Sequence, residues 1–98
     1  MTDELEALRS EIDALDREIV GLLNRRAALG LAAGKAKMQS GRPIPDADRE
    51  REVMVRVAMA NEGPIPQDAL LALYRQLIDT IKRLEEIEKS DSGAGGEF

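Results

Sequence analysis

Hydrophobic or small residues in the N-terminal part of the chain recur at alternating spacings of three and four, at Leu5, Leu8, Ile12, Leu15, Ile19, Leu22, Leu29, Ala33 and Ala36. This spacing is typical of a helix that packs lengthwise against a partner helix. Thr2 is the expected N-cap, with acidic residues after it. Gly41 and Pro43 predict that the helix ends near Ser40, which makes it about 55 Å long.

Two shorter helical segments follow, each preceded by a stretch that contains proline. Asp46 is the expected N-cap of a helix that extends to about Asn61. Its apolar face comprises Val53, Met54 and Val57. A third helix is expected after Pro66, with a heptad-like stripe of Leu70, Leu73, Tyr74, Leu77, Ile78, Ile81 and Leu84. The Ser- and Gly-rich residues 90–98 predict a flexible tail or linker beyond a helical domain of residues 1–89.

The first helix is too long to be covered by the other two helices of the same chain. These helices span roughly 24 and 33 Å, so part of the stripe from Leu5 to Leu22 would face water in a monomer. An exposed apolar stripe of this length usually marks an interface. We therefore predict an all-α fold with three helices per subunit, in which two long helices pair antiparallel within an intertwined six-helix homodimer.

The composition excludes several classes of function. Hydrophobic residues make up 43% of the chain and aromatic residues only 2%, which favours helices over a sheet. Because the sequence has no cysteine and no histidine, disulfides, thiol nucleophiles, the usual zinc sites and a Ser-His-Asp triad are excluded. A net charge of −5 disfavours nucleic acid and anionic membranes as partners. With no membrane-spanning run and no signal-peptide pattern, we expect a cytoplasmic protein that needs no cofactor.

One charged residue interrupts the hydrophobic stripe of the long helix. Arg26 stands where an apolar residue is expected, and a guanidinium buried there needs an anionic partner. Lys37 lies eleven residues later, about three turns away on nearly the same face. In an antiparallel dimer that crosses near Val20, Arg9 of one subunit lies near residue 31 of the other, between these two cations. Three converging cations predict a small ligand with at least two carboxylates or phosphates.

Charged residues on the shorter helices are positioned to face the same ligand. One face of the second helix combines, at spacings of three and four, Asp46, Arg49 and Glu50. Glu85 falls on the buried face of the third helix, whereas Lys82 and Glu86 are expected to point away from it. For each of these charged residues taken alone, a helix cap or a solvated surface side chain is the alternative interpretation.

Several short motifs occur in a fixed order along the chain. They are Leu8-Arg9, Ile12-Asp13-x-Leu15-Asp16, Leu22-Leu23-x-Arg25-Arg26, Gly34-Lys35-Ala36-Lys37 and Asp46-x-Asp48-Arg49-Glu50. This ordered set resembles the all-α chorismate mutases, whose small helical subunits form intertwined dimers, and the resemblance covers about residues 4–88. It implies that the chain rearranges chorismate to prephenate, a pericyclic step that requires neither a nucleophile nor a metal.

The resemblance also implies roles for the cations of the long helix. Arg26 and, from the partner subunit, Arg9 match the arginines that bind the two carboxylates of the substrate. Lys37 matches a lysine that reaches the ether oxygen and a carboxylate. Catalysis would then come from holding the compact chair conformer and from stabilising charge as the ether C–O bond breaks.

The remaining matches lie on the two shorter helices. Glu50 matches the carboxylate that binds the ring hydroxyl, and Asp46 and Arg49 match residues that help to position it. Two positions depart from the family pattern: Ile81 stands where a small hydroxyl residue is frequent, and Glu85 where many members carry Gln. Because an ether oxygen only accepts hydrogen bonds, Glu85 must be protonated to serve it, which predicts the best turnover at mildly acidic pH.

Three alternatives to a chorismate mutase remain open at this stage. An isochorismate pyruvate lyase would use the same fold and a similar cationic pocket. A regulatory or interaction module would belong to a larger shikimate-pathway enzyme, with a DAHP synthase domain or partner. A plain coiled-coil dimeriser would need no pocket, and replacement of Arg26 by Leu should then increase its stability without loss of activity.

Overall fold

Three helices make up the part of the chain that the structure describes. The computed structural model describes residues 2–41 and 46–95, with side chains over 3–41 and 46–89. In chain order the helices are α1 (Thr2–Gln39), α2 (Ala47–Ala60) and α3 (Gln67–Gly95). Within these ranges there is no strand, which confirms the predicted all-α fold with one long helix and two shorter ones. None of the described helices is both long enough and apolar enough to cross a bilayer.

The end of α1 follows from the residues that the sequence places there. Thr2, the expected N-cap, is instead the first residue within the helix. The helix ends in a turn in which the Gly41 N–H donates to the carbonyl oxygen of Met38 at 3.2 Å. Gly41 has a φ of 76°, a left-handed conformation that glycine adopts without steric cost. Pro43, the other predicted stop signal, lies outside the described residues.

The third helix is longer than the sequence predicts. α3 continues to Gly95 instead of ending near Lys89, so it measures about 43 Å rather than about 33 Å. Residues 90–95 include no proline, so each of them keeps the N–H that helical hydrogen bonding requires. The assignment of 90–98 to a tail or linker outside the helical domain stays a prediction, and residues 96–98 lie outside the described part.

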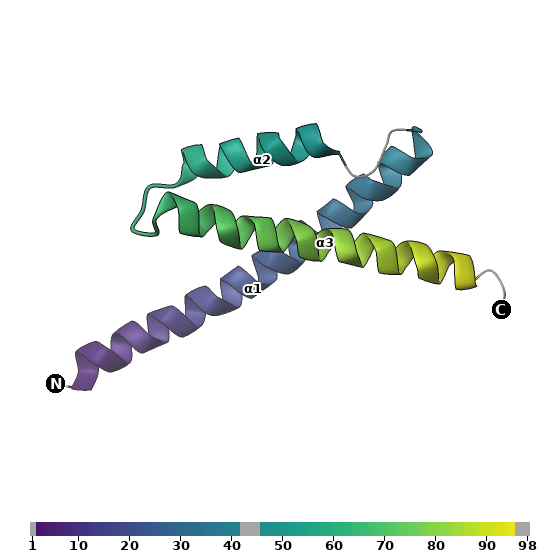
Figure 1. The fold of residues 1–98 in the computed structure, drawn as a ribbon. Coiled ribbons are helices and arrows are strands. Elements are labelled where there is room, and N and C mark those ends of the chain that lie inside the picture. Colours follow the sequence, from purple (N-terminus) through teal and green to yellow (C-terminus); the bar gives the residue numbers. More distant parts are fainter. Residues whose placement is uncertain (1, 42–45, 96–98) are drawn as a thin grey trace.

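α3 packs against both other helices: it crosses α1 obliquely and runs antiparallel beside α2 (Figure 1). The buried hydrophobic side chains among the described residues are Ile78 and Ile81 of α3, with 7% and 5% of their surface exposed. Gly30 of α1 faces Ile81, because a Cβ at position 30 would lie 2.9 Å from its Cγ2 atom. The absence of a side chain at Gly30 therefore allows α1 and α3 to approach closely at their crossing.

The N-terminal half of α1 extends away from the other two helices (Figure 1). Side chains with at least half of their surface exposed there include Leu5, Leu8, Ile12, Leu15, Ile19 and Leu22. The chain exposes 7906 Å², whereas a compact monomer of this mass would expose about 5,500 Å². Its radius of gyration, 17.8 Å, also exceeds the value of about 13 Å expected for a compact domain of this length. A single chain thus leaves the predicted apolar stripe open to solvent.

Candidate active site

A cleft of about 410 Å³ lies where α1, the start of α2 and the middle of α3 meet. The predicted site residues that line it are Arg26, Lys37, Asp46, Arg49, Glu50 and Glu85. The apolar part of its wall includes Leu29, Val53, Ile78 and Ile81. Residues that lie far apart in the sequence therefore converge on one site within a single chain.

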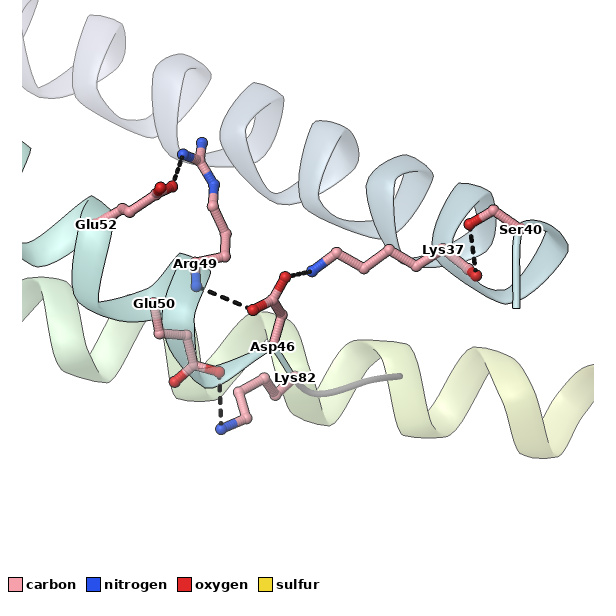
Figure 2. Close-up of polar contacts among 7 residues, drawn as sticks. All are labelled: Lys37, Ser40, Asp46, Arg49, Glu50, Glu52 and Lys82. Atoms are coloured by element: carbon pink, nitrogen blue, oxygen red, sulfur yellow. Dashed lines mark hydrogen bonds and ion pairs between the residues drawn. The ribbon is translucent and has the colours of Figure 1, made fainter. Parts of the chain in front are cut away.

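The cations of α1 occupy one side of the cleft. Arg26 and Lys37 both line it, as their spacing of eleven residues predicts. The guanidinium of Arg26 lies beside Gly30, where a Cβ would be 3.3 Å from its Nη1 atom. Lys37 has 24% of its side chain exposed and places Nζ 3.1 Å from Oδ2 of Asp46 (Figure 2). The half-buried Arg26 and Lys37 together provide positive charge to one side of the cleft.

Asp46 connects Lys37, near the end of α1, to the start of α2. It is the N-cap of α2, as predicted, because its Oδ1 atom accepts from the backbone N–H of Arg49 at 3.0 Å. Its other carboxylate oxygen accepts from Lys37 (Figure 2). The backbone hydrogen bond from Arg49, followed by the one from the Lys37 ammonium, holds the pKa of Asp46 below its usual value. Asp46 therefore stays ionised and fixes the position of Lys37.

Both carboxylate oxygens of Glu50 are paired with cations of α3. Arg75 Nη1 lies 2.9 Å from Oε1, and Lys82 Nζ lies 3.3 Å from Oε2. Only 20% of the Glu50 side chain is exposed. This burial raises the pKa of Glu50, but the hydrogen bonds from Arg75 and Lys82 outweigh it, so the net pKa is lowered. Glu50 is thus an oriented hydrogen-bond acceptor at the edge of the cleft.

The prediction that Lys82 points away from the site is wrong. Lys82 lines the cleft and binds Glu50, as Figure 2 shows. The reason is that α3 contacts two helices, so the arc of α3 that faces protein is wider than one hydrophobic stripe. Arg75, Ile78 and Lys82 follow one another at spacings of three and four, and this pattern in the sequence would have placed both cations beside Ile78.

Glu85 faces α1 from the other side of the cleft. A Cβ at Gly34 would lie 3.2 Å from Cδ of Glu85, so the glycine makes room for this carboxyl group. Burial raises the pKa of Glu85 above its usual value; Lys37 and Lys82 oppose this effect, and Glu50 adds to it. Glu85 therefore holds a proton more readily than an ordinary glutamate, as a hydrogen bond to an ether oxygen requires.

The two remaining arginines differ in where they lie. Arg49 lines the cleft, but its Nη1 atom binds Oε2 of Glu52 at 3.2 Å (Figure 2). Arg9 lies on the exposed N-terminal half of α1 and pairs with Glu6 at 3.5 Å, outside the cleft of its own chain. Its predicted contribution to the cleft of a second subunit remains a prediction.

The arrangement suits a small anion that also carries a hydroxyl group. Arg26 and Lys37 offer charged donors to carboxylates, Glu50 offers an acceptor to a hydroxyl, and Glu85 in its protonated form offers a hydrogen-bond donor to a weak acceptor. No metal-binding group of three or more acidic side chains is found among the described residues. The cleft can therefore bind a dicarboxylate and stabilise a charge that develops within it.

Comparison with known proteins agrees with this chemistry. Residues 8–86 match the family described as chorismate mutase type II. The chain is 40% identical over 88 residues to the bifunctional chorismate mutase/prephenate dehydratase of Aquifex aeolicus, covering 86% of this chain and 24% of that protein. It is 42% identical over 72 residues to the intracellular chorismate mutase of Mycobacterium tuberculosis, covering 74% of this chain and 67% of that one.

A solved structure extends the agreement to the fold. The chorismate mutase of Thermus thermophilus superposes with a TM-score of 0.78 at 32% identity, covering 85% of this chain and 94% of that one. The chain spans only about a quarter of the length of the Aquifex relative, so it corresponds to one part of that bifunctional protein. By its sequence and its helical fold, this chain belongs to the chorismate mutase type II family.

Proposed function

We propose that this chain catalyses the rearrangement of chorismate to prephenate in the cleft between its three helices. The observation that supports this proposal is the convergence of Arg26, Lys37, Glu50 and Glu85 on one cleft. In the reaction the ether C–O bond breaks while a C–C bond forms within the same molecule, so no atom is exchanged with the protein. The protein has only to hold the reactive conformer and to stabilise the charge on the ether oxygen.

We assign contacts with the substrate to four cleft residues and to Arg9 of the partner subunit. Arg26 binds one carboxylate, and the partner's Arg9 binds the other. Lys37 donates to the ether oxygen and a carboxylate, while protonated Glu85 donates to the same ether oxygen. Glu50 accepts the hydrogen bond of the ring hydroxyl. These contacts favour the compact chair over extended conformers of the substrate.

The proposed enzyme is a homodimer in which two copies of α1 lie antiparallel. The exposed apolar stripe of α1 and the large exposed surface of a single chain support this arrangement. A crossing near Val20 would bring Arg9 of each subunit to the cleft of the other. The mycobacterial relative is named an intracellular enzyme, and we place this chain in the cytoplasm as well.

The product of the reaction suggests the chemistry that follows it. The Aquifex relative combines a chorismate mutase with a prephenate dehydratase, which by its name consumes prephenate. We propose that this chain supplies prephenate to the synthesis of aromatic amino acids. The expected DAHP synthase domain or partner has no counterpart in the relatives named above, and it stays a prediction.

Complementation between two inactive variants tests the proposed shared site. Arg9→Ala and Arg26→Ala homodimers should each lose turnover, measured as the loss of chorismate absorbance. A heterodimer isolated by two different tags contains one cleft with both arginines intact and one cleft with neither. It should therefore recover about half of the wild-type activity.

Two results would contradict the proposal. If Arg9 served the cleft of its own chain, the heterodimer would be as inactive as its parents. If the wild-type protein left chorismate unchanged but released pyruvate from isochorismate, the activity would be that of a lyase. Arg25→Ala is the matched control, because Arg25 is exposed and does not line the cleft.

A further inference from the structure

Glu50 is held differently from Asp46, the other carboxylate near the start of α2 that lines the cleft. Asp46 is fixed by its own helix and by Lys37 of α1, whereas Glu50 is bound by two cations of α3. Arg75 and Lys82 lie seven residues apart, about two turns along α3, and reach Glu50 from either side of Ile78. Each cation takes one oxygen, so the carboxylate is fixed in orientation as well as in position.

The two cations occupy different positions relative to the cleft. Lys82 lines it, whereas Arg75 is not part of its wall and has 43% of its side chain exposed. Arg75 also lies 4.0 Å from Asp79 of the same helix, so Glu50 is its closer carboxylate. Of the two carboxylates that Arg75 pairs with, Glu50 is the one that lines the cleft, so Glu50 connects Arg75 to a bound molecule.

A carboxylate held at both oxygens can still accept a hydrogen bond. Each carboxylate oxygen has two lone-pair positions, and the contacts with Arg75 and Lys82 take one on each side. The remaining positions of Glu50, which lines the cleft, are available to a substrate hydroxyl. Without the two cations the Glu50 side chain would regain rotamers that point away from the cleft.

We propose that Arg75 and Lys82 are positioning residues that hold Glu50 in the one orientation that accepts the ring hydroxyl of the substrate. This inference rests on the proposed function. It goes beyond it by assigning a role in turnover to Arg75, a residue that does not line the cleft. Arg75 acts at a distance from the substrate, and Lys82 completes the clamp from the cleft wall.

Arg75→Gln tests the inference, with Lys35→Gln as its matched control. Lys35 forms a 2.7 Å ion pair with Glu88 that also joins two helices, and neither residue lines the cleft. Both substitutions remove one partly exposed interhelical ion pair, so both should lower the melting temperature slightly. Only Arg75→Gln should lower kcat/KM for chorismate, by about 10-fold or more, because misplacement of a binding group by about 1 Å is costly.

Three further measurements separate positioning from a structural role. Arg75→Lys, which keeps the positive charge, should restore most of the lost kcat/KM. In a Glu50→Gln background, Arg75→Gln should lower kcat/KM by less than about 2-fold further, because the residue through which Arg75 acts is already changed. A bicyclic dicarboxylate inhibitor with a hydroxyl should bind wild type more tightly than its deoxy analogue, and this preference should shrink in Arg75→Gln.

The outcomes distinguish this inference from the function on which it rests. If wild-type protein fails to convert chorismate, the proposed function and the inference both fail. If wild type is active and Arg75→Gln has the same kcat/KM as Lys35→Gln, the inference alone fails. It also fails if the effects of Arg75→Gln and Glu50→Gln simply multiply in the double variant.

Discussion

The two halves of α1 differ in what surrounds them. From Arg26 onwards the helix packs against α3, and two of its cations, Arg26 and Lys37, line a formed cleft. Towards its N-terminus the same helix lies open, and Arg9 contacts only Glu6 within its chain among the contacts described. Both halves have the same hydrophobic spacing, so the pattern predicts a covered face but not which chain covers it. One half contributes to a cleft within its own chain, whereas the apolar stripe of the other half is exposed in a single chain.

The largest expected effect comes from a charge in the open half. Leu15→Glu places a carboxylate on the exposed stripe, and in a dimer it would bury unpaired charge from both copies. We expect dissociation to monomers and loss of activity by more than about 100-fold, since each cleft would lose the arginine of its partner. Sedimentation analysis and the chorismate absorbance assay measure the two effects.

A control for this substitution lies on the opposite face of α1. Ser10 is exposed and falls outside the hydrophobic series, so Ser10→Glu adds the same charge without entering the stripe. It should leave both the dimer and the activity unchanged. A Leu15→Glu protein that remained a fully active dimer would show that the open half is not the interface.

A smaller effect is expected at Glu85 of α3, which faces Gly34 in the covered half of α1. Its pKa is raised by burial, so the proton that it donates is lost only as the pH rises through this raised value. At a pH two units above the midpoint, wild type should retain about 1% of its maximal kcat, whereas Glu85→Gln should stay active because an amide does not titrate.

The control for Glu85→Gln is its exposed neighbour. Glu86 does not line the cleft, so Glu86→Gln should reproduce the wild-type pH profile. A wild-type profile that is flat into the alkaline range would show that Glu85 does not act as a proton donor.

The smallest effects are expected from substitutions at two glycines, one in each half of α1. Gly30→Ala brings a Cβ within 2.9 Å of Ile81, and we expect this overpacking to lower the free energy of unfolding by about 1–3 kcal/mol. The higher helix propensity of alanine offsets up to about 1 kcal/mol of this loss. A Cβ at Gly21 would meet no neighbouring side chain within 4 Å among the described residues, and Gly21→Ala should stabilise by up to about 1 kcal/mol. Urea unfolding measures both changes in the free energy of unfolding. Changes of the same sign would contradict the contrast between the halves.

The sequence predicts those parts of the fold that depend on local signals. The hydrophobic spacing predicts α1, and Asp46 is identified as a cap because its side chain bonds to a backbone N–H only three residues away. Arg26 is found because a cation on an apolar stripe conflicts with the local pattern. In each of these examples a short stretch of sequence contains both the signal and the structure that it predicts.

Two features are not predicted from the sequence: the contacts of Glu50 with cations of α3, and the point at which α3 ends. The spacing of Arg75 and Lys82 can place both cations beside Ile78, but only the packing of α2 beside α3 brings Glu50 between them. The composition of the residues after Lys89 predicts an end of α3 there, but composition alone does not stop a helix that no proline interrupts. Tertiary contacts therefore decide which of the charged side chains turn inwards.

The length of α1 has a mechanical consequence for the proposed enzyme. Gly21 lies twelve residues from Arg9, so this arginine is about 18 Å from the glycine along the helix axis. A bend of only about 3° at the glycine would displace Arg9 by about 1 Å, and such a displacement can lower the rate by about 100-fold. The rigidity of the paired α1 helices, far from any reacting atom, would then limit how fast the opposite subunit turns over.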